Sequence, residues 1–335
     1  MRRQSGRGDG EAGAVTSNAS HGRIAFQPYS RPGTLGEYLP DPTRPVERWY
    51  NRPNSGNATT ARETILDLCG QPPTAVVDPF CGAGCTAVAA RELGTPFYGI
   101  EWDPILACVS HSKAMARRHH AHLLRSIPEL NSAQGLLKFC AGLELDHEHP
   151  TDEMHTACLA VLLCLAGEAG VPTRLEDIEA DLEKVGPTEP QPSAKGLVRS
   201  GDCTNPRTWT GIPEAMRGAV VFTSPPFYRT GLPLGVSDEL RAAASLLFPR
   251  RMPQPPASTE ASYADNVIGM LRVLTRHLRS GWILMEHEPG DSTPEGLEAV
   301  AERIGRETDY RADRVLTTKT FSKAGPLSLI MCGRE

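Results

Sequence analysis

The sequence lacks the features that mark membrane-spanning and exported proteins. No apolar run approaches the roughly 18 residues that a bilayer requires. The N-terminus, MRRQSGRGDGEAG, carries charge but not the apolar core of a secretory signal. Hydrophobic residues make up 39% of the chain and charged residues 22%, which are values typical of a globular protein. We therefore expect a soluble, cytoplasmic protein.

Paired cysteines are absent as well. The nine cysteines are scattered, with no CxxC pair, so packed thiols in a reducing compartment are the simplest account. Cys81 and Cys85 flank a glycine turn, which leaves a redox or metal role open. A zinc site is left open by a group of histidines: His119, His120, His122, His147 and His149. Helices rich in Arg and His are more often solvated faces, so we expect no metal.

A basic surplus is the third missing feature. The chain has 35 basic and 40 acidic residues, which gives a net charge of −5. DNA-binding domains usually carry excess positive charge, because neutralising phosphates supplies much of their affinity. A DNA-binding face would have to gather arginines locally, and four candidates lie in one stretch: Arg229, Arg241, Arg250 and Arg251.

Patterning divides the chain into four parts. Residues 1–40 are rich in Gly, Ser, Arg and Pro and have no sustained period, so we expect a flexible segment outside the fold. Residues 41–126 and 196–335 alternate buried strands with amphipathic helices, which predicts an α/β fold with a doubly wound, mostly parallel seven-stranded sheet. Residues 127–195 form a predicted helical insertion over the substrate side of the sheet. Its run RLEDIEADLEK is typical of a solvated helix face.

The first part of the core contains a strand, glycine turn, helix and second strand that ends at an acid. AVVDPF is followed by GAGCTAVAARELG and PFYGIEWDP. Gly82 and Gly84 let the backbone approach a ligand, and Glu101 is placed to accept both ribose hydroxyl protons. Asp78 before the turn would repel a pyrophosphate but suits a sulfonium with its ammonium group. This favours S-adenosylmethionine over NAD. Upstream, Thr60 and Glu63 form a capping box for a helix that ends at Gly70.

A second motif, Thr223 to Tyr228, follows the strand GAVVFTSPPF. Open α/β sheets place their sites at this end of the strands. The two prolines fix the backbone and remove amide donors, which leaves carbonyl acceptors. Ser224 and the Pro225 carbonyl are suited to accept both protons of an NH2 group, and Phe227 or Tyr228 to stack on a flat ring.

Together, DPFCGAGC and TSPPF resemble the DNA amino-methyltransferases, which methylate adenine N6 or cytosine N4. The resemblance implies a Rossmann-like class I methyltransferase core and, from Ser-Pro-Pro-Phe, cytosine N4 in preference to adenine N6. It implies these catalytic residues: Ser224, Pro225, Pro226, Phe227 and Tyr228. It implies these S-adenosylmethionine-binding residues: Thr60, Asp78, Pro79, Phe80, Cys81, Gly82, Gly84, Glu101, Trp102, Asp202 and Cys203.

Two alternatives to DNA methylation remain. No segment has the pattern of a target-recognition domain, and the insertion lies between the second and third core strands. These features and the acidic balance favour a biosynthetic enzyme that tailors a small planar natural product. Such an enzyme would methylate nitrogen, or alkylate carbon, or form a ring, for example by cyclopropanation. The third reading is a relative that binds DNA or a partner without catalysis.

Overall fold

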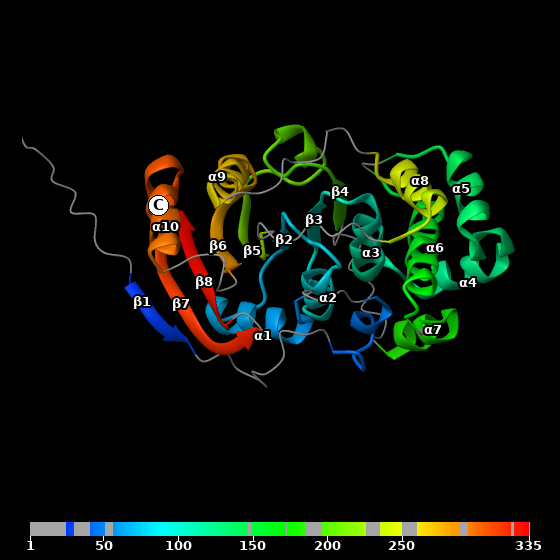
Figure 1. Ribbon diagram of the computed structural model, residues 1–335, viewed down its shortest axis with the longest axis horizontal. Helices are drawn as coiled ribbons and strands as arrows, with labels where there is room; N and C mark the ends of the chain where they lie inside the picture. The colour runs from blue at the N-terminus through cyan, green and yellow to red at the C-terminus, as the bar shows by residue number, and fades with distance from the viewer. Residues whose placement is uncertain are drawn as a thin grey trace, which may run out of the picture.

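The computed structural model describes residues 25–29, 41–50, 56–146, 149–171, 173–184, 196–225, 235–249, 260–287, 294–322 and 325–334. A mixed sheet runs through this part of the chain in the order β1-β7-β8-β6-β5-β2-β3-β4 (Figure 1). Its strands are β1 (Ala25–Tyr29), β2 (Val76–Asp78), β3 (Phe97–Glu101), β4 (Leu197–Ser200), β5 (Met216–Thr223), β6 (Leu278–His287), β7 (Tyr310–Ser322) and β8 (Gly325–Arg334).

Helices cover both faces of the sheet. The α-helices are α1 (Ala58–Cys69), α2 (Cys85–Glu92), α3 (Pro104–Met115), α4 (Arg118–Ser126), α5 (Ala133–Ala141), α6 (Asp152–Glu168), α7 (Leu175–Lys184), α8 (Asp238–Leu247), α9 (Glu260–His277) and α10 (Pro294–Glu307). Short 3-10 helices are η1 (Glu47–Trp49), η2 (Pro128–Asn131) and η3 (Pro206–Trp209). The buried residues of α1 to α8 form one core cluster, and those of α9 and α10 form another on the opposite face.

Alternation along the central strands explains the two cores. Val76 and Val220 face the cluster of α1, α2 and α3, whereas Val77 and Val221 face the cluster of α9 and α10. Successive side chains of a strand point to opposite faces, so a strand covered on both sides needs a continuous apolar run. The runs AVV and GAVVF meet this need. The predicted doubly wound α/β fold is therefore confirmed.

The strand directions also follow the expectation. Strands β2, β3, β4, β5 and β6 pair in parallel, and β8 pairs antiparallel with both β6 and β7. All seven predicted strands are present. The eighth, β1, pairs in parallel with β7 at the edge of the sheet. Because β1 spans residues 25–29, the expectation that residues 1–40 stay outside the fold is wrong for these five positions. Residues 1–24 and 30–40 lie outside the described residues.

Helix α1 begins earlier than its sequence pattern indicates. The N-cap is Asn57, whose side chain accepts a hydrogen bond from the backbone N–H of Thr60 at 3.1 Å. The predicted capping box of Thr60 and Glu63 is therefore wrong, because Thr60 lies inside the helix. The C-terminal signal holds: Gly70 follows the helix with φ +71°, the left-handed conformation that glycine adopts without strain.

The inserted helices lie beyond α3, at the β4 end of the sheet (Figure 1). Helix α6 packs on α3, and α5 and α6 both pack on α8, the helix that follows the Ser-Pro-Pro motif. The insertion is therefore helical, as predicted. Its predicted position over the substrate side of the sheet stays a prediction. The run RLEDIEADLEK is not a wholly solvated face, since Asp181 is fully buried together with Ile178. The solvated-face interpretation is wrong at those positions.

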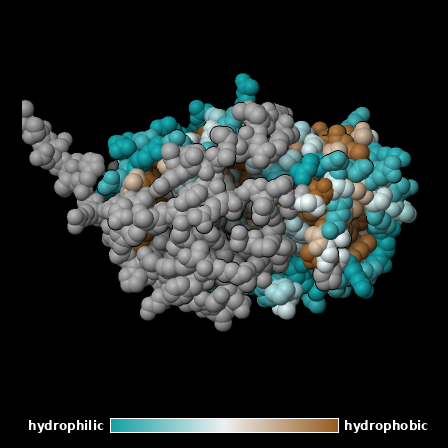
Figure 2. All heavy atoms as spheres, viewed as in Figure 1, coloured by the Kyte–Doolittle hydropathy of each residue, from teal (hydrophilic) through white to brown (hydrophobic). Residues whose placement is uncertain are grey.

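The surface of the inserted end is mainly polar. Figure 2 shows hydrophilic residues over this end, with apolar patches between them. In the described part of the chain, the exposed large apolar side chains are Leu123 and Leu246, at 39% and 40% exposure. No helix among the described residues combines the length and the apolar character that crossing a membrane would demand.

Candidate active site

Acidic side chains gather where the parallel strands end. Asp78 and Glu101 are the last residues of β2 and β3, and Asp202 follows β4. Ser224 follows β5, and Glu286 is the last residue but one of β6. Parallel neighbours end at the same edge of a sheet, and β2 lies between β3 and β5, where the chain order reverses. Ligands of open α/β sheets bind in the crevice at this point.

The glycine loop turns sharply at Gly82 and Gly84, whose φ angles are +49° and +80°. Among the described residues, a Cβ built on Gly82 would have within 4 Å only the Phe80 carbonyl oxygen, at 3.9 Å, so these residues leave the space beside it open. A Cβ on Gly84 would lie 2.9 Å from Ser110 Oγ. The two glycines thus serve different ends. Gly82 leaves room for a ligand, and Gly84 allows α2 to approach α3.

The predicted loop residues between Asp78 and Gly82 have mostly structural contacts. Pro79 is buried and Phe80 half-buried. Cys81 is 3% exposed, and burial raises the pKa of its thiol far above the usual value. Burial also raises the pKa of Cys85, to about 12. Reactive cysteines need a lowered pKa. The redox alternative for Cys81 and Cys85 is therefore not supported by their surroundings.

Glu101 ties the loop to β3. Its Oε2 accepts a hydrogen bond from Gly82 N at 2.8 Å, and its Oε1 accepts one from Asp103 N at 2.9 Å. Burial raises the pKa of Glu101 to about 7, and the neighbouring carboxylates of Asp103 and Asp78 add to the rise. The carboxyl group is therefore held beside the glycine turn, and its pKa lies near neutral pH. Trp102 is half-buried next to it, and its carbonyl accepts a hydrogen bond from Ser200 Oγ at 3.4 Å.

Asp78 is buried among neutral donors. Its Oδ1 accepts hydrogen bonds from Thr223 Oγ1 at 2.6 Å and from Phe80 N at 3.1 Å. The side chain is 3% exposed, and burial raises its pKa to about 6, with a further contribution from the charge of Glu286. The hydrogen bond from Thr223 joins the end of β2 to the end of β5, and so joins the two predicted motifs.

Ser224 is bonded to an acid that the sequence analysis missed. Its hydroxyl donates to Glu286 Oε2 at 2.7 Å. Ser224 is half-buried, Pro225 is buried, and Glu286 is only 3% exposed. The signal for Glu286 was present, since it is a charged residue at the end of the apolar strand WILMEHE. The other predicted catalytic residues, Pro226, Phe227 and Tyr228, lie outside the described residues.

The turn at Asp202 follows β4, the strand at one end of the sheet. Asp202 Oδ1 accepts hydrogen bonds from the backbone N–H and the hydroxyl of Thr204, both at 2.8 Å. Cys203 is buried, and its carbonyl accepts from Trp209 Nε1 at 2.8 Å, which gives it a structural role. Thr60, predicted to bind the cofactor, is half-buried in the first turn of α1.

A hollow of about 490 Å³ lies on the α9 side of the Asp202 turn. Its lining residues are Thr204, Pro206, Asp265, Asn266, Gly269, Arg272, Val273 and Arg276. None of the predicted cofactor-binding or catalytic residues that the structure describes lines it. We therefore place the candidate site at the strand ends and not in this hollow.

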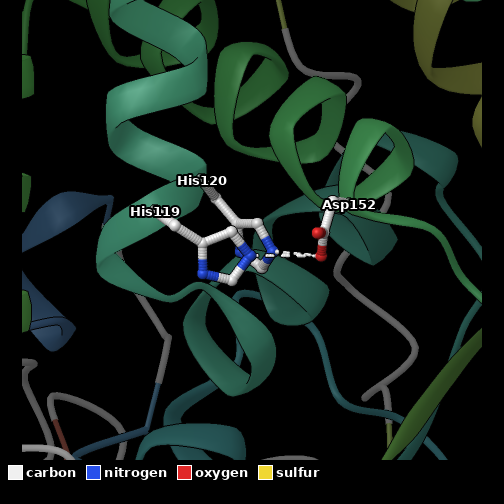
Figure 3. Close-up of side chains that lie close together, drawn as sticks. All are labelled: His119, His120 and Asp152. Carbon is white, nitrogen blue, oxygen red and sulfur yellow. Dashed lines mark hydrogen bonds and ion pairs between the residues drawn. The ribbon is translucent and has the colours of Figure 1, made fainter.

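The histidine cluster comes closest to a metal site among the described residues. The Nε2 atoms of His119 and His120 both lie 3.1 Å from Asp152 Oδ1 (Figure 3). However, His120 Nδ1 accepts a hydrogen bond from Arg117 N at 3.0 Å, so the proton of the neutral ring is on Nε2 and is donated to Asp152. A metal at Nε2 would leave the ring without either proton. Burial lowers the pKa of His120 to about 3, which keeps the ring neutral.

The remaining histidines extend this packing. His155 stacks on His120, and its Nδ1 lies 2.7 Å from His111 Nε2. His149 is exposed and bonds to Asp146 at 3.0 Å, and His147 lies outside the described residues. Hydrogen bonds join the buried histidines of α3, α4 and α6, although His111 Nδ1 has no partner among the described residues. The expectation of no metal stays a prediction.

Comparisons with known proteins give structural neighbours alone. No family model matches the chain, and no curated protein does. Among solved structures, the rRNA methyltransferase aviRa from Streptomyces viridochromogenes has 16% identity and a TM-score of 0.39, over 85% of this chain and 88% of that one. TrmN from Thermus thermophilus has 11% identity and a TM-score of 0.39, over 87% of this chain and 52% of that one.

A third solved structure is described as "Conversion of a Disulfide Bond into a Thioacetal Group during Echinomycin Biosynthesis". It has 11% identity and a TM-score of 0.35, over 81% of this chain and 80% of that one. The sheet itself is more informative. Counted from β2 and leaving out the edge strand β1, its order is 3-2-1-4-5-7-6 with an antiparallel last strand, which is typical of class I methyltransferases.

Proposed function

We propose that the chain is an S-adenosylmethionine-dependent methyltransferase that acts on an amino group. The observation that carries this proposal is the linked pair of motifs at the switch point of the sheet. Gly82 N–H bonds to Glu101 on one side of β2, and Asp78 bonds to Thr223, next to Ser224, on the other. A cofactor loop and an acceptor for the reacting group are thus joined through one buried carboxylate.

The loop fits a cationic nucleoside cofactor. The described residues leave the space beside Gly82 open, and Glu101 is positioned for ribose hydroxyls. Burial raises the pKa of Asp78, and the hydrogen bonds from Thr223 and Phe80, which lower it, offset this only in part. A positively charged ligand would compensate the charge of the ionised carboxylate, whereas a pyrophosphate would be repelled. S-adenosylmethionine bound here would supply a methyl group on a positively charged sulfur.

Ser224 and Glu286, at the ends of β5 and β6, supply hydrogen-bond acceptors for a substrate amino group. Because the Ser224 hydroxyl proton is donated to Glu286, the Oγ lone pairs remain free to accept an N–H of the substrate. Pro225 has no amide proton and offers a carbonyl acceptor. When nitrogen gains a methyl group it must lose a proton. Ser224 can take that proton while passing its own to Glu286, a relay that orients the amine and removes the proton together.

Our leading substrate is the exocyclic amino group of a DNA base, cytosine N4 or adenine N6. The Ser-Pro-Pro-Phe motif supports this choice, with the base flipped out of the stack to reach it. The arginine candidates Arg229, Arg250 and Arg251 lie outside the described residues, and Arg241 lies in α8.

The second candidate is a small planar natural product, alkylated at nitrogen or carbon or closed into a ring. The charge of the site favours it. Among the described residues, the strand ends carry Asp78, Glu101, Asp103, Asp202 and Glu286, and negative charge at a site repels phosphates. The net charge of −5 acts in the same direction.

One experiment separates the two candidates. The transfer of a labelled methyl group from S-adenosylmethionine to unmethylated DNA is measured with the wild-type chain and with Ser224→Ala as the matched control. Methylated DNA formed by the wild type alone supports the DNA reading. In that case DNA affinity should fall by orders of magnitude between about 50 and 200 mM salt if six or more phosphates are contacted.

Cofactor binding is measured alongside by calorimetry. Binding of S-adenosylmethionine without DNA binding at low salt would reject the DNA reading and leave the tailoring enzyme. Absence of cofactor binding would reject the methyltransferase itself.

A further inference from the structure

The segment that precedes α1 contains a strained residue. Val46 has φ +65° and ψ −48°, and its side chain is 1% exposed. A β-branched residue rarely adopts positive φ, because its Cβ crowds the backbone. Such strain persists only where the surroundings hold it, and it concentrates at functional sites. We name residues 46–50 the anchor segment.

The inserted helices hold the anchor segment. The carboxylate of Asp181, on α7, is fully buried and accepts hydrogen bonds from Val46 N at 3.1 Å and Trp49 Nε1 at 3.0 Å. It also accepts two from the Arg48 guanidinium, both at 2.8 Å. Thr173 Oγ1, just before α7, donates to the Trp49 carbonyl at 2.8 Å. The insertion thus satisfies the backbone and side chains of a segment more than 120 positions away in the sequence.

The anchor segment in turn holds the start of α1. The Glu47 side chain, which is fully buried, accepts a hydrogen bond from Ala58 N at 2.8 Å. Lys113 on α3 donates through Nζ to the carbonyls of Glu47 and Tyr50, at 3.2 and 2.6 Å. The first turn of α1 is therefore held by Glu47 of the anchor segment, and the anchor segment is itself held by Lys113 of α3.

The start of α1 touches the glycine loop. A Cβ built on Gly56 would lie 2.9 Å from Sγ of Cys85, the first residue of α2 after the loop. A Cβ on Gly84 would lie 3.4 Å from Cδ of Lys113. Asp181 is therefore linked through the anchor segment to Lys113, which lies close to Gly84 of the loop that we propose binds the cofactor.

We propose that Asp181 is a positioning residue for the cofactor site, and that the insertion serves to hold the anchor segment and the start of α1 against the glycine loop. The inference rests on the proposed function, because it takes S-adenosylmethionine as the ligand of the loop. The insertion contributes here to cofactor affinity, from a helix that lies outside the candidate active site.

The test is calorimetry of S-adenosylmethionine with Asp181→Asn. Asparagine keeps the size of the side chain but loses the charge. Its NH2 group replaces a carboxylate oxygen that accepts hydrogen bonds, and so places a donor opposite donors. If the anchor segment is then in place about one tenth of the time, the apparent Kd rises about 10-fold. Glu183→Gln on the same helix is the matched control, since Glu183 is exposed and pairs with Arg118. Its Kd should equal that of the wild type.

A second control separates positioning from loss of stability. Leu136 on α5 is fully buried, and its side chain is not part of the hydrogen bonds to the anchor segment. Leu136→Ala should therefore lower the Tm of the chain. Its Kd for S-adenosylmethionine should stay within about twofold of the wild type. The inference is overturned if Asp181→Asn leaves the Kd unchanged, or if Leu136→Ala weakens binding as much as Asp181→Asn does.

If Asp181→Asn does not fold, Thr173→Val decides. It removes one hydrogen bond to the anchor segment, and an unchanged Kd overturns the inference, whereas a rise of about threefold supports it. A wild-type chain that does not bind S-adenosylmethionine would overturn the proposed function together with this inference. Wild-type binding with unaffected variants would overturn the inference alone.

Discussion

Cofactor affinity should fall as the pH is lowered, because two carboxylates of the site have raised pKa values. Burial raises the pKa of Glu101 to about 7 and that of Asp78 to about 6. A sulfonium ligand with an ammonium group binds the ionised carboxylates more strongly than the protonated ones, so protonation competes with binding.

The magnitude follows from the two pKa values. Between about pH 7.5 and about pH 5.5, the ionised fraction of a group with a pKa near 7 falls about 25-fold, and that of a group with a pKa near 6 falls about fourfold. If binding requires both groups ionised and they titrate independently, the Kd of S-adenosylmethionine rises about 100-fold over this range. This corresponds to about 2.7 kcal/mol of binding free energy.

The assay is calorimetric titration of the ligand-free chain at several pH values. Glu101→Gln should bind more weakly at about pH 7.5 but show a rise of only about fourfold on acidification, since Asp78 alone still titrates. A raised carboxyl pKa in the folded state favours the folded chain at low pH, so these two groups do not unfold it there. A Kd that stays constant from neutral to acidic pH in the wild type would refute the reasoning.

Three further outcomes are expected. Gly82→Ala should still fold, with a modest loss of stability because φ is +49°, and should bind S-adenosylmethionine at least about 10-fold more weakly by calorimetry, since its Cβ enters the space that we propose the cofactor occupies. Gly84→Ala should instead lower the free energy of unfolding by about 1–3 kcal/mol in urea titration, because φ is +80° and the new Cβ meets Ser110 at 2.9 Å. Glu286→Gln should lower kcat about 100-fold and leave the cofactor Kd unchanged, because it interrupts the proton path from Ser224 without touching the loop. Equal losses of cofactor affinity at Gly82 and Glu286 would contradict this division.

The local parts of the site were predictable because each depends on a short run of residues. A buried strand, a glycine turn and a terminal acid fixed the expectation for Asp78, Gly82 and Glu101, and the structure brings them together. The Ser224 turn was likewise identified from the strand before it. Short-range patterns of this kind reflect the backbone freedom of glycine and the period of strands, which need no knowledge of the rest of the chain.

Other features depend on contacts between distant segments. Asp181 looked solvated because its neighbours in sequence are charged, yet its donors come from residues 46–49. Glu286 lies beside Ser224 only because β6 pairs with β5. The edge strand β1 pairs with β7, almost the whole chain away, from a segment rich in glycine. Tertiary contacts decide the surroundings of these residues, and local sequence propensities do not contain those contacts.

Two groups of perturbed side chains in this fold call for opposite interpretations. The pKa of His120 is lowered by burial, but its ring donates to Asp152 and accepts from Arg117 N, so every polar atom of the neutral ring is satisfied within the fold. Asp78 differs, because its partners in the described part of the chain are the neutral donors Thr223 and Phe80 N–H, while burial and the charge of Glu286 raise its pKa. A perturbed pKa indicates a functional site when the missing partner must come from outside. Within the described residues His120 has both ring partners and Asp78 has no cationic one, which is why we propose a cationic ligand at the strand ends.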